Sequence, residues 1–90
     1  MTISIQISSN NEYEVTVQSN TITTHLVTLS DEVHKNLTNE KVTKEELLDF
    51  SFKFLLDREP NASIMSSFEL TVISRYFSDY EKSVKKWCSS

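Results

Sequence analysis

Two histidines and one cysteine are the side chains of this 90-residue chain that could most readily do nucleophilic, acid–base or metal chemistry. His25 lies in a segment typical of a strand, and the spacing from His25 to His34 matches no pair of metal ligands on a helix. No cluster of cysteines or acidic residues completes a metal site. If His25 faces inward, we interpret it as a partly buried strand residue across from Glu14, and not as a catalytic base.

Missing residue types exclude several classes of enzyme. The single Cys88 rules out an internal disulfide framework and a multi-cysteine metal site, and we interpret it as an exposed thiol. The chain has no glycine, whereas dinucleotide-binding turns, phosphate-binding loops and the nucleophile elbow of hydrolases all need one. We therefore predict no catalytic residue, no cofactor and no metal.

The net charge of −4 is unevenly distributed. Residues 1–29 hold two acids and no Lys or Arg, residues 30–60 hold eight acids and five bases, and residues 61–90 hold three acids and four bases. The basic cluster is formed by Lys82, Lys85 and Lys86, which could contact an acidic partner or complement the dipole of a last helical turn. An acidic chain argues against nucleic acid as a partner, because phosphate contacts supply most non-specific affinity.

The first third of the chain predicts a three-stranded antiparallel meander, because Thr, Ser, Ile and Val alternate there with period two. The core-facing residues predicted for the first two strands are Ile3, Ile5, Ile7, Tyr13, Val15 and Val17. If both sets face the core, Ile7 lies opposite Tyr13, and a three-residue loop over Ser9-Asn10-Asn11 joins the strands. Asn suits a left-handed position in that loop.

A third strand of about residues 21–29 follows a turn at Ser19-Asn20, and its register leaves two alternatives. The inward residues after a two-residue turn are Ile22, Thr24 and Leu26. The inward residues after a longer turn are His25, Val27 and Leu29.

Two helices follow. Ser30 with acids behind it predicts the N-cap of a short helix that ends near residues 37–39. Thr43 and Glu46 have the spacing of a capping box, which opens a helix from Lys44 to about Arg58 before Pro60. The apolar residues of this helix cover roughly two-thirds of its circumference at about 100° per residue. A helix of this kind is either central to the monomer or covered on its second side by a partner.

The last third indicates further helices. Residues 66–77 could form a capped helix, although residues 70–73 are strand-like by propensity. Ser78 and Glu81 form a second capping-box pattern, which predicts a terminal helix carrying Val84 and Trp87. The sequence thus predicts one α+β domain over residues 1–90, with strands over about 2–29 followed by three or four helices over about 30–88.

Residues 24–60 resemble a ribbon-helix-helix domain in the order strand, short helix, turn, longer helix. The segments that carry the resemblance are His25–Val33 and Val42–Leu48. Strands of such dimers pair antiparallel and enter the major groove, so the resemblance implies that Leu26 and Thr28 would face the bases. The family uses Arg, Lys, Asn or Gln at those positions to contact base edges. This chain has Leu26 and Thr28 there instead.

The N-terminal hairpin, Phe52–Pro60 and Ile73–Glu81 are also similar to a group of short, uncharacterised bacterial proteins. That resemblance implies a bacterial origin and no particular activity. The sequence shows neither a signal-peptide pattern nor a membrane-spanning run, so we expect a cytoplasmic protein without membrane contact.

We expect a small, non-enzymatic protein-interaction or regulatory module that forms a homodimer. The wide apolar face of the Lys44–Arg58 helix and the available edge of the sheet motivate the dimer. The alternative function is a degenerate ribbon-helix-helix DNA-binding or antitoxin-like regulator. The predicted partner surface comprises Leu26, Thr28, Phe52, Leu56, Lys82, Lys85 and Lys86.

Overall fold

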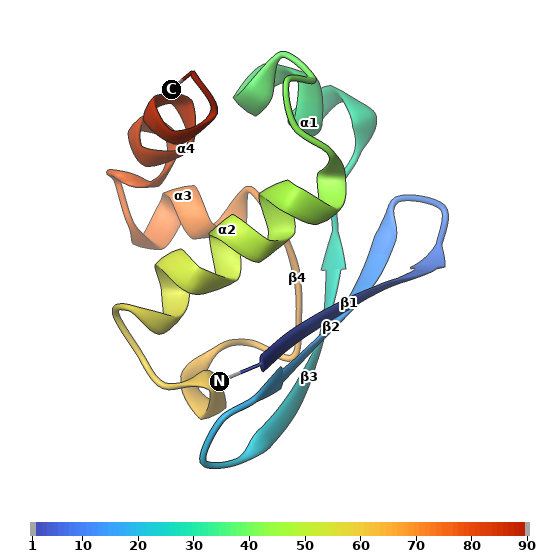
Figure 1. The fold of residues 1–90 in the computed structure, drawn as a ribbon, viewed down its shortest axis with the longest axis vertical. Coiled ribbons are helices and arrows are strands. Elements are labelled where there is room, and N and C mark those ends of the chain that lie inside the picture. Colours follow the sequence, from blue (N-terminus) through green and yellow to red (C-terminus); the bar gives the residue numbers. More distant parts are fainter. Residues whose placement is uncertain (1, 90) are drawn as a thin grey trace.

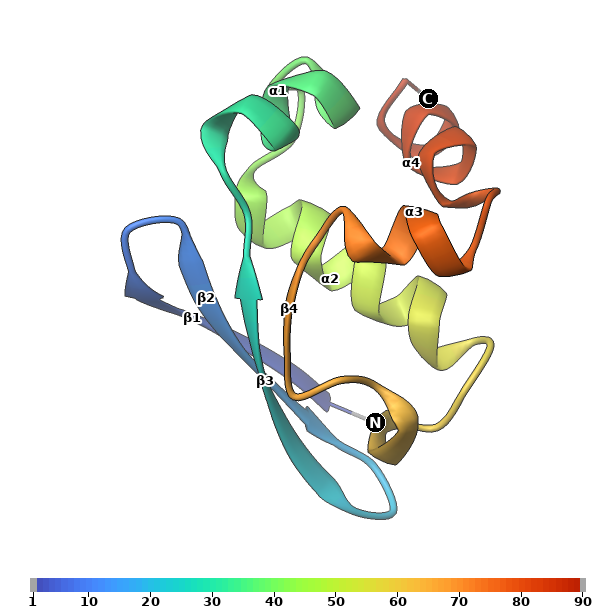
Figure 2. The same ribbon diagram turned by 180° about the vertical axis from the view of Figure 1, so that it is seen from behind.

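The computed structural model describes residues 2–89, which form a four-stranded mixed sheet with helices on one side of it (Figures 1 and 2). The sheet has the strand order β1-β2-β3-β4. The elements are β1 (Thr2–Ser9), β2 (Glu12–Gln18), β3 (Ile22–Thr28), α1 (Asp31–Thr38), α2 (Lys44–Leu56), the 3-10 turn η1 (Asn61–Ser63), β4 (Ser67–Glu69), α3 (Val72–Tyr76) and α4 (Tyr80–Cys88).

The predicted antiparallel meander is confirmed, and Ile7 pairs with Tyr13 as expected. The loop differs from the prediction because the register shifts between Ile7 and Ser9, so that Ser9 pairs with Glu12. The extra residue becomes a bulge in β1, and only Asn10 and Asn11 remain in the loop. Asn11 adopts a left-handed conformation with φ of 64°, as its residue type favours.

The third strand takes the register of the longer turn. Gln18 pairs with Ile22, which leaves residues 19–21 as the connection. His25 and Val27 therefore point into the core and are buried, together with Leu29 just beyond the strand. Ile22, which the shorter turn would bury, is 66% exposed.

The predicted helix over residues 66–77 is wrong at its start. Ser67–Glu69 forms β4, which pairs parallel with β3, and Phe68 is opposite Val27. Backbone hydrogen bonds from Leu26 to Ser66 and from Leu70 to Thr28 flank the pairing. Without β4, the backbone N–H and C=O groups on this side of β3 would have no partner in the sheet. Strands are therefore not confined to residues 2–29, and α3 is shorter than predicted.

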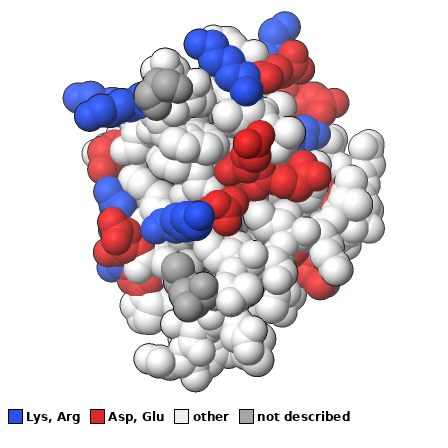
Figure 3. All heavy atoms as spheres, viewed as in Figure 1, with Lys and Arg blue, Asp and Glu red and all other residues white. Residues whose placement is uncertain are grey.

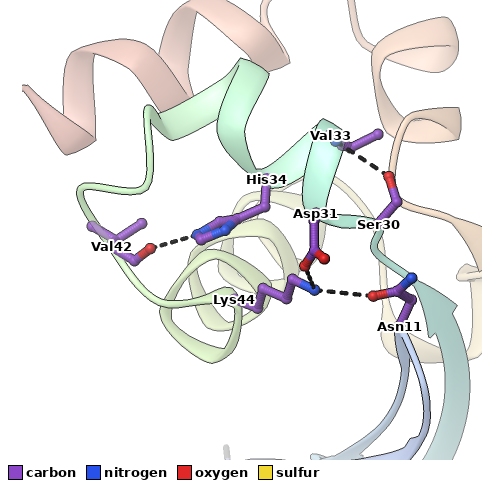
Figure 4. Close-up of polar contacts among 7 residues, drawn as sticks. All are labelled: Asn11, Ser30, Asp31, Val33, His34, Val42 and Lys44. Carbon is purple, nitrogen blue, oxygen red and sulfur yellow. Dashed lines mark hydrogen bonds and ion pairs between the residues drawn. The ribbon is translucent and has the colours of Figure 1, made fainter.

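Both predicted helix starts at Ser30 and Thr43 are confirmed. The Ser30 hydroxyl accepts from the Val33 amide at 3.2 Å (Figure 4). Thr43 and Glu46 form a complete capping box: the Thr43 hydroxyl accepts from the Glu46 amide at 3.0 Å, and the Glu46 carboxylate accepts from the Thr43 amide at 2.8 Å. Helix α2 ends at Leu56, two residues before the predicted Arg58.

Lys44 joins three elements where α1, α2 and the β1–β2 loop meet (Figure 4). Its Nζ lies 2.5 Å from the Asp31 carboxylate and donates to the Asn11 side chain at 3.1 Å. The hydrogen bond from Lys44 lowers the pKa of the Asp31 carboxyl. A lysine in a first helical turn opposes the helix dipole, and the Asp31 charge offsets that repulsion. Nearby, the His34 ring is hydrogen-bonded to the Val42 carbonyl.

Helix α2 lies between the sheet and the C-terminal helices (Figure 1). Its buried residues are Leu47, Leu48, Ser51, Phe52, Phe54 and Leu55. Tyr80 of α4 packs edge-on against Phe54, and Trp87 of α4 stacks on Phe50 with ring centroids 4.4 Å apart. The helix is therefore central to the monomer. Phe52 has no exposed surface, so its prediction as a partner-facing residue is wrong.

The predicted capping box at Ser78 and Glu81 does not form. Asp79 is the N-cap of α4, and its side chain makes no capping hydrogen bond. The Asp79 carboxylate instead accepts from Arg58 at 2.9 Å, while the Arg58 guanidinium lies 3.5 Å from the centroid of the Phe54 ring. This pair ties the end of α2 to the start of α4.

A buried hydroxyl pair connects α2 to α4 and generates a stability prediction. The Ser51 hydroxyl donates to the Leu47 carbonyl at 2.7 Å, so the Tyr80 hydroxyl donates to Ser51 at 2.6 Å. Ser51→Ala leaves the Tyr80 hydroxyl buried without an acceptor, at a cost of about 1–3 kcal/mol, whereas Tyr80→Phe should cost about 1 kcal/mol. In urea unfolding, the Ser51→Ala/Tyr80→Phe double variant should have about the same free energy of unfolding as Tyr80→Phe. A loss equal to the sum of the two single losses would contradict this assignment.

The buried hydroxyl of Tyr80 also leads us to predict that the protein loses stability at alkaline pH. Burial raises the pKa of the Tyr80 hydroxyl well above its ordinary value. Above a pH of about 10 the unfolded chain releases this proton while the folded chain retains it, so the stability present at lower pH falls as pH rises. Tyr80→Phe should reduce the alkaline slope of the unfolding free energy. A smaller slope should remain from Tyr13, whose pKa burial also raises. Equal slopes for both proteins would overturn the prediction.

Candidate functional site

His25 is a structural residue at the centre of a satisfied polar chain. It is 2% exposed, and its Nδ1 lies 2.7 Å from the Met65 carbonyl oxygen, which can only accept. The proton therefore sits on Nδ1, and Nε2 accepts from the Thr23 hydroxyl at 2.8 Å. The Asn61 amide donates to the same hydroxyl at 3.0 Å and to the Thr21 carbonyl at 3.1 Å.

No carboxylate acts with His25. The strand register places Val15 opposite His25, and Glu14 is opposite Leu26 on the other face of the sheet. The expectation of a pair between His25 and Glu14 is therefore wrong, because Glu14 lies between the inward-facing Tyr13 and Val15 and points to the opposite face from His25. Across residues 2–89 no group of three or more His, Cys, Asp or Glu side chains is arranged to hold a metal ion.

An apolar groove of about 390 Å³ lies between the end of α2, the η1–β4 segment and α3, elements that Figure 2 shows facing one another. Its walls are predominantly hydrophobic and aromatic. The lining residues are Leu55, Glu59, Ser63, Ile64, Met65, Phe68, Val72, Ile73, Tyr76 and Phe77. A volume of this size is typical of ligand sites, which are commonly about 300–1,000 Å³.

The groove combines buried walls with exposed apolar side chains. Ile64, Phe68 and Ile73 are buried, whereas Met65 is 42% and Tyr76 69% exposed. Exposed large apolar side chains beside a hollow are typical of interaction sites.

Glu59 supplies the charge of the groove. It is half-buried in the lining, and within the described part of the chain no Lys or Arg forms an ion pair with it. A half-buried carboxylate without a cation favours a ligand that brings one.

The polar chain around His25 holds one wall of the groove in place. Met65 belongs to the segment that His25 and Asn61 bind to β3, and the Leu26 amide donates to the Ser66 carbonyl at 2.8 Å in the same segment. The two ends of the groove wall, η1 and β4, are thereby attached to the sheet. His25 and Asn61 are thus positioning residues for the groove.

The residues predicted as a partner surface lie elsewhere. Leu26 and Thr28 are half-buried on the outer face of β3, between β2 and β4. Leu56 is half-buried at the end of α2, and the lysines of α4 are exposed. None of them lines the groove.

β3 also differs from the strand of a ribbon-helix-helix dimer. It is paired with β2 along its length and with β4 over residues 26–28, so that this stretch has no free edge for a second copy. The two edge strands of the sheet are the long β1, which pairs only with β2, and the short β4, which pairs only with β3.

Comparison with protein-family models, with curated proteins and with solved structures gave no match. Among residues 2–89, none of the helices has the length and hydrophobicity needed to cross a bilayer.

The role assigned to His25 predicts that His25→Phe loosens the groove wall. The variant removes, at the buried His25 position, the donor to the Met65 carbonyl and the acceptor for the Thr23 hydroxyl, which should cost about 1–3 kcal/mol in urea unfolding. Amide exchange should accelerate in residues 64–67 more than in β1. His34→Phe is the control, because it also removes a histidine–carbonyl bond but at a half-buried position, where water can replace it. Equal effects of both changes would contradict the assignment.

Proposed function

We propose that this protein is a non-enzymatic interaction module that binds a segment of a protein partner in the groove between α2 and α3. The observation that carries the proposal is the apolar hollow with Met65 and Tyr76 exposed beside it. Exposed apolar surface costs free energy in water, and burial by a partner recovers about 25 cal/mol per Å². A short regulatory protein can act through such a contact alone.

The chemistry of the lining specifies the partner segment. The hollow has room for large apolar side chains, and Glu59 is its one ionisable carboxylate. An apolar anchor with a Lys or Arg close to it satisfies both features, and a cation could also stack on the exposed Tyr76 ring. We therefore expect an apolar and basic segment.

The arrangement of the polar groups supports a binding function over a catalytic one. Both ring nitrogens of His25 are engaged in holding the Thr23 and Met65 segments together. His34 is bonded to the Val42 carbonyl, far along the chain from the groove residues. Neither histidine lines the groove, so neither is placed to exchange protons with a ligand there.

Selection from a random peptide library on the immobilised protein tests the proposal. We expect enriched peptides with one or two large apolar residues beside Lys or Arg. Glu59→Gln should weaken their binding about threefold, as expected for one partly exposed ion pair of about 0.2–1 kcal/mol. Met65→Lys, at an exposed position, removes apolar surface and repels a basic segment, so it should abolish binding while the unfolding midpoint stays unchanged.

The matched control is Glu69→Gln, which removes an exposed carboxylate from β4 outside the groove lining. It should leave peptide affinity unchanged. Failure to enrich any peptide, or enrichment that survives Met65→Lys, would rule out this groove as the binding site.

A further inference from the structure

β1 is an edge strand whose protective features are limited to the bulge between Ile7 and Ser9. It is hydrogen-bonded to β2 on one side only, and residues 2–9 contain no charged residue and no proline. Proteins normally blunt such edges with Lys, Pro or very short strands, since exposed backbone amides and carbonyls can pair with another chain. In Figure 3 the charged side chains gather over the helical part of the face, while the part over the β2–β3 turn is white.

The core-facing side of β1 has apolar surface left uncovered at one end. Ile3 and Ile5 are half-buried beneath the helices, whereas Ile7, on the same side, is 70% exposed. The three isoleucines alternate with the polar residues Ser4 and Gln6, so that β1 has one apolar and one polar face.

Symmetry restricts how a second copy could pair with this strand. Antiparallel pairing of one strand with itself requires a two-fold axis perpendicular to the sheet, which leaves both sets of helices on the same side. Directly opposite residues then point to the same face, so isoleucine must meet isoleucine, and Ser or Gln must meet Ser or Gln.

We propose that two copies of this chain form a homodimer by antiparallel β1–β1 pairing, with Ile5 opposite Ile5 of the second copy. This register places Ile3 opposite Ile7 of the other copy and Ser4 opposite Gln6. It gives every isoleucine of β1 an isoleucine partner, including the exposed Ile7. A register centred on Ser4 gives Ile7 no partner within residues 2–9, and one centred on Gln6 brings Ile3 against Ser9, beyond the bulge.

The dimer has a continuous eight-stranded sheet, because each copy contributes four strands. The groove lies beside β4, at the opposite edge from β1, so both copies keep theirs open. This inference does not depend on the function proposed for the groove. If both hold, two grooves on one particle bind a two-site partner with increased avidity.

Two charge variants that share one substitution test the pairing. Ser4→Lys/Gln6→Lys places lysines opposite each other across the axis, whereas Ser4→Glu/Gln6→Lys places opposite charges there. Within the monomer, position 4 faces Thr16 and position 6 faces Glu14, so the shared lysine suits both variants. Like charges directly opposite are unfavourable and opposite charges are favourable, so the dimer constants of the two variants should differ about tenfold, which corresponds to about 1.4 kcal/mol.

Light scattering coupled to size exclusion, from micromolar to millimolar chain concentration, measures the outcome. The unmodified protein and Ser4→Glu/Gln6→Lys should approach twice the chain mass of 10.4 kDa, and Ser4→Lys/Gln6→Lys should need about ten times the concentration of Ser4→Glu/Gln6→Lys to do so. A monomeric unmodified protein over the whole range, or equal dimerisation of both variants, overturns the proposal.

Cysteine substitution tests the register independently, in case a charge variant fails to fold. In a Cys88→Ser background, Ile5→Cys should form an intermolecular disulfide on mild oxidation, because the two β-carbons face each other at the axis. Ile3→Cys should not, since it faces Ile7. Cross-linking of Ile3→Cys alone would overturn this register.

Discussion

Burial of α2 on two sides is the constraint on which the rest of the molecule depends. A helix with six buried side chains needs more cover than one face of a small sheet can give. The sheet covers one side through β1 and its neighbours, and Tyr80, Phe77 and Trp87 bring the C-terminal helices onto the other. This helix contributes Leu47, Leu48, Phe52, Phe54 and Leu55 to the hydrophobic core, and both layers pack against it.

A core of this size includes polar groups only where their hydrogen bonds are complete. The Ser51–Tyr80 pair crosses from α2 to α4, and the chain from Asn61 through Thr23 to His25 crosses from η1 to β3. Throughout residues 2–89 no buried side-chain nitrogen or oxygen lacks a partner. Because hydrogen bonds are directional, these bonds favour one arrangement of a core that hydrophobic burial alone would allow to repack.

Features encoded within a few residues were predictable, and features that need distant partners were not. The caps at Ser30 and Thr43 and the pairing of Ile7 with Tyr13 follow from spacing and parity. β4 was missed because three residues gain their strand conformation from β3. Ser78 was expected to cap α4, but Asp79 is the N-cap residue, and its carboxylate accepts from Arg58, 21 residues away. The groove was missed for the same reason, since its lining comes from four segments with no common motif.

The attachment of β4 to β3 has a consequence for the order of folding. The meander and the capped helices close contacts between near neighbours, whereas His25 must find Met65 across 40 residues. Contacts of long sequence separation form late because loop closure costs entropy before they give any stabilisation. The groove and its β4 wall should therefore be the last part of the molecule to gain protection in pulsed hydrogen exchange, and the first to open. A ligand bound in the groove would then stabilise the part of the structure that forms last.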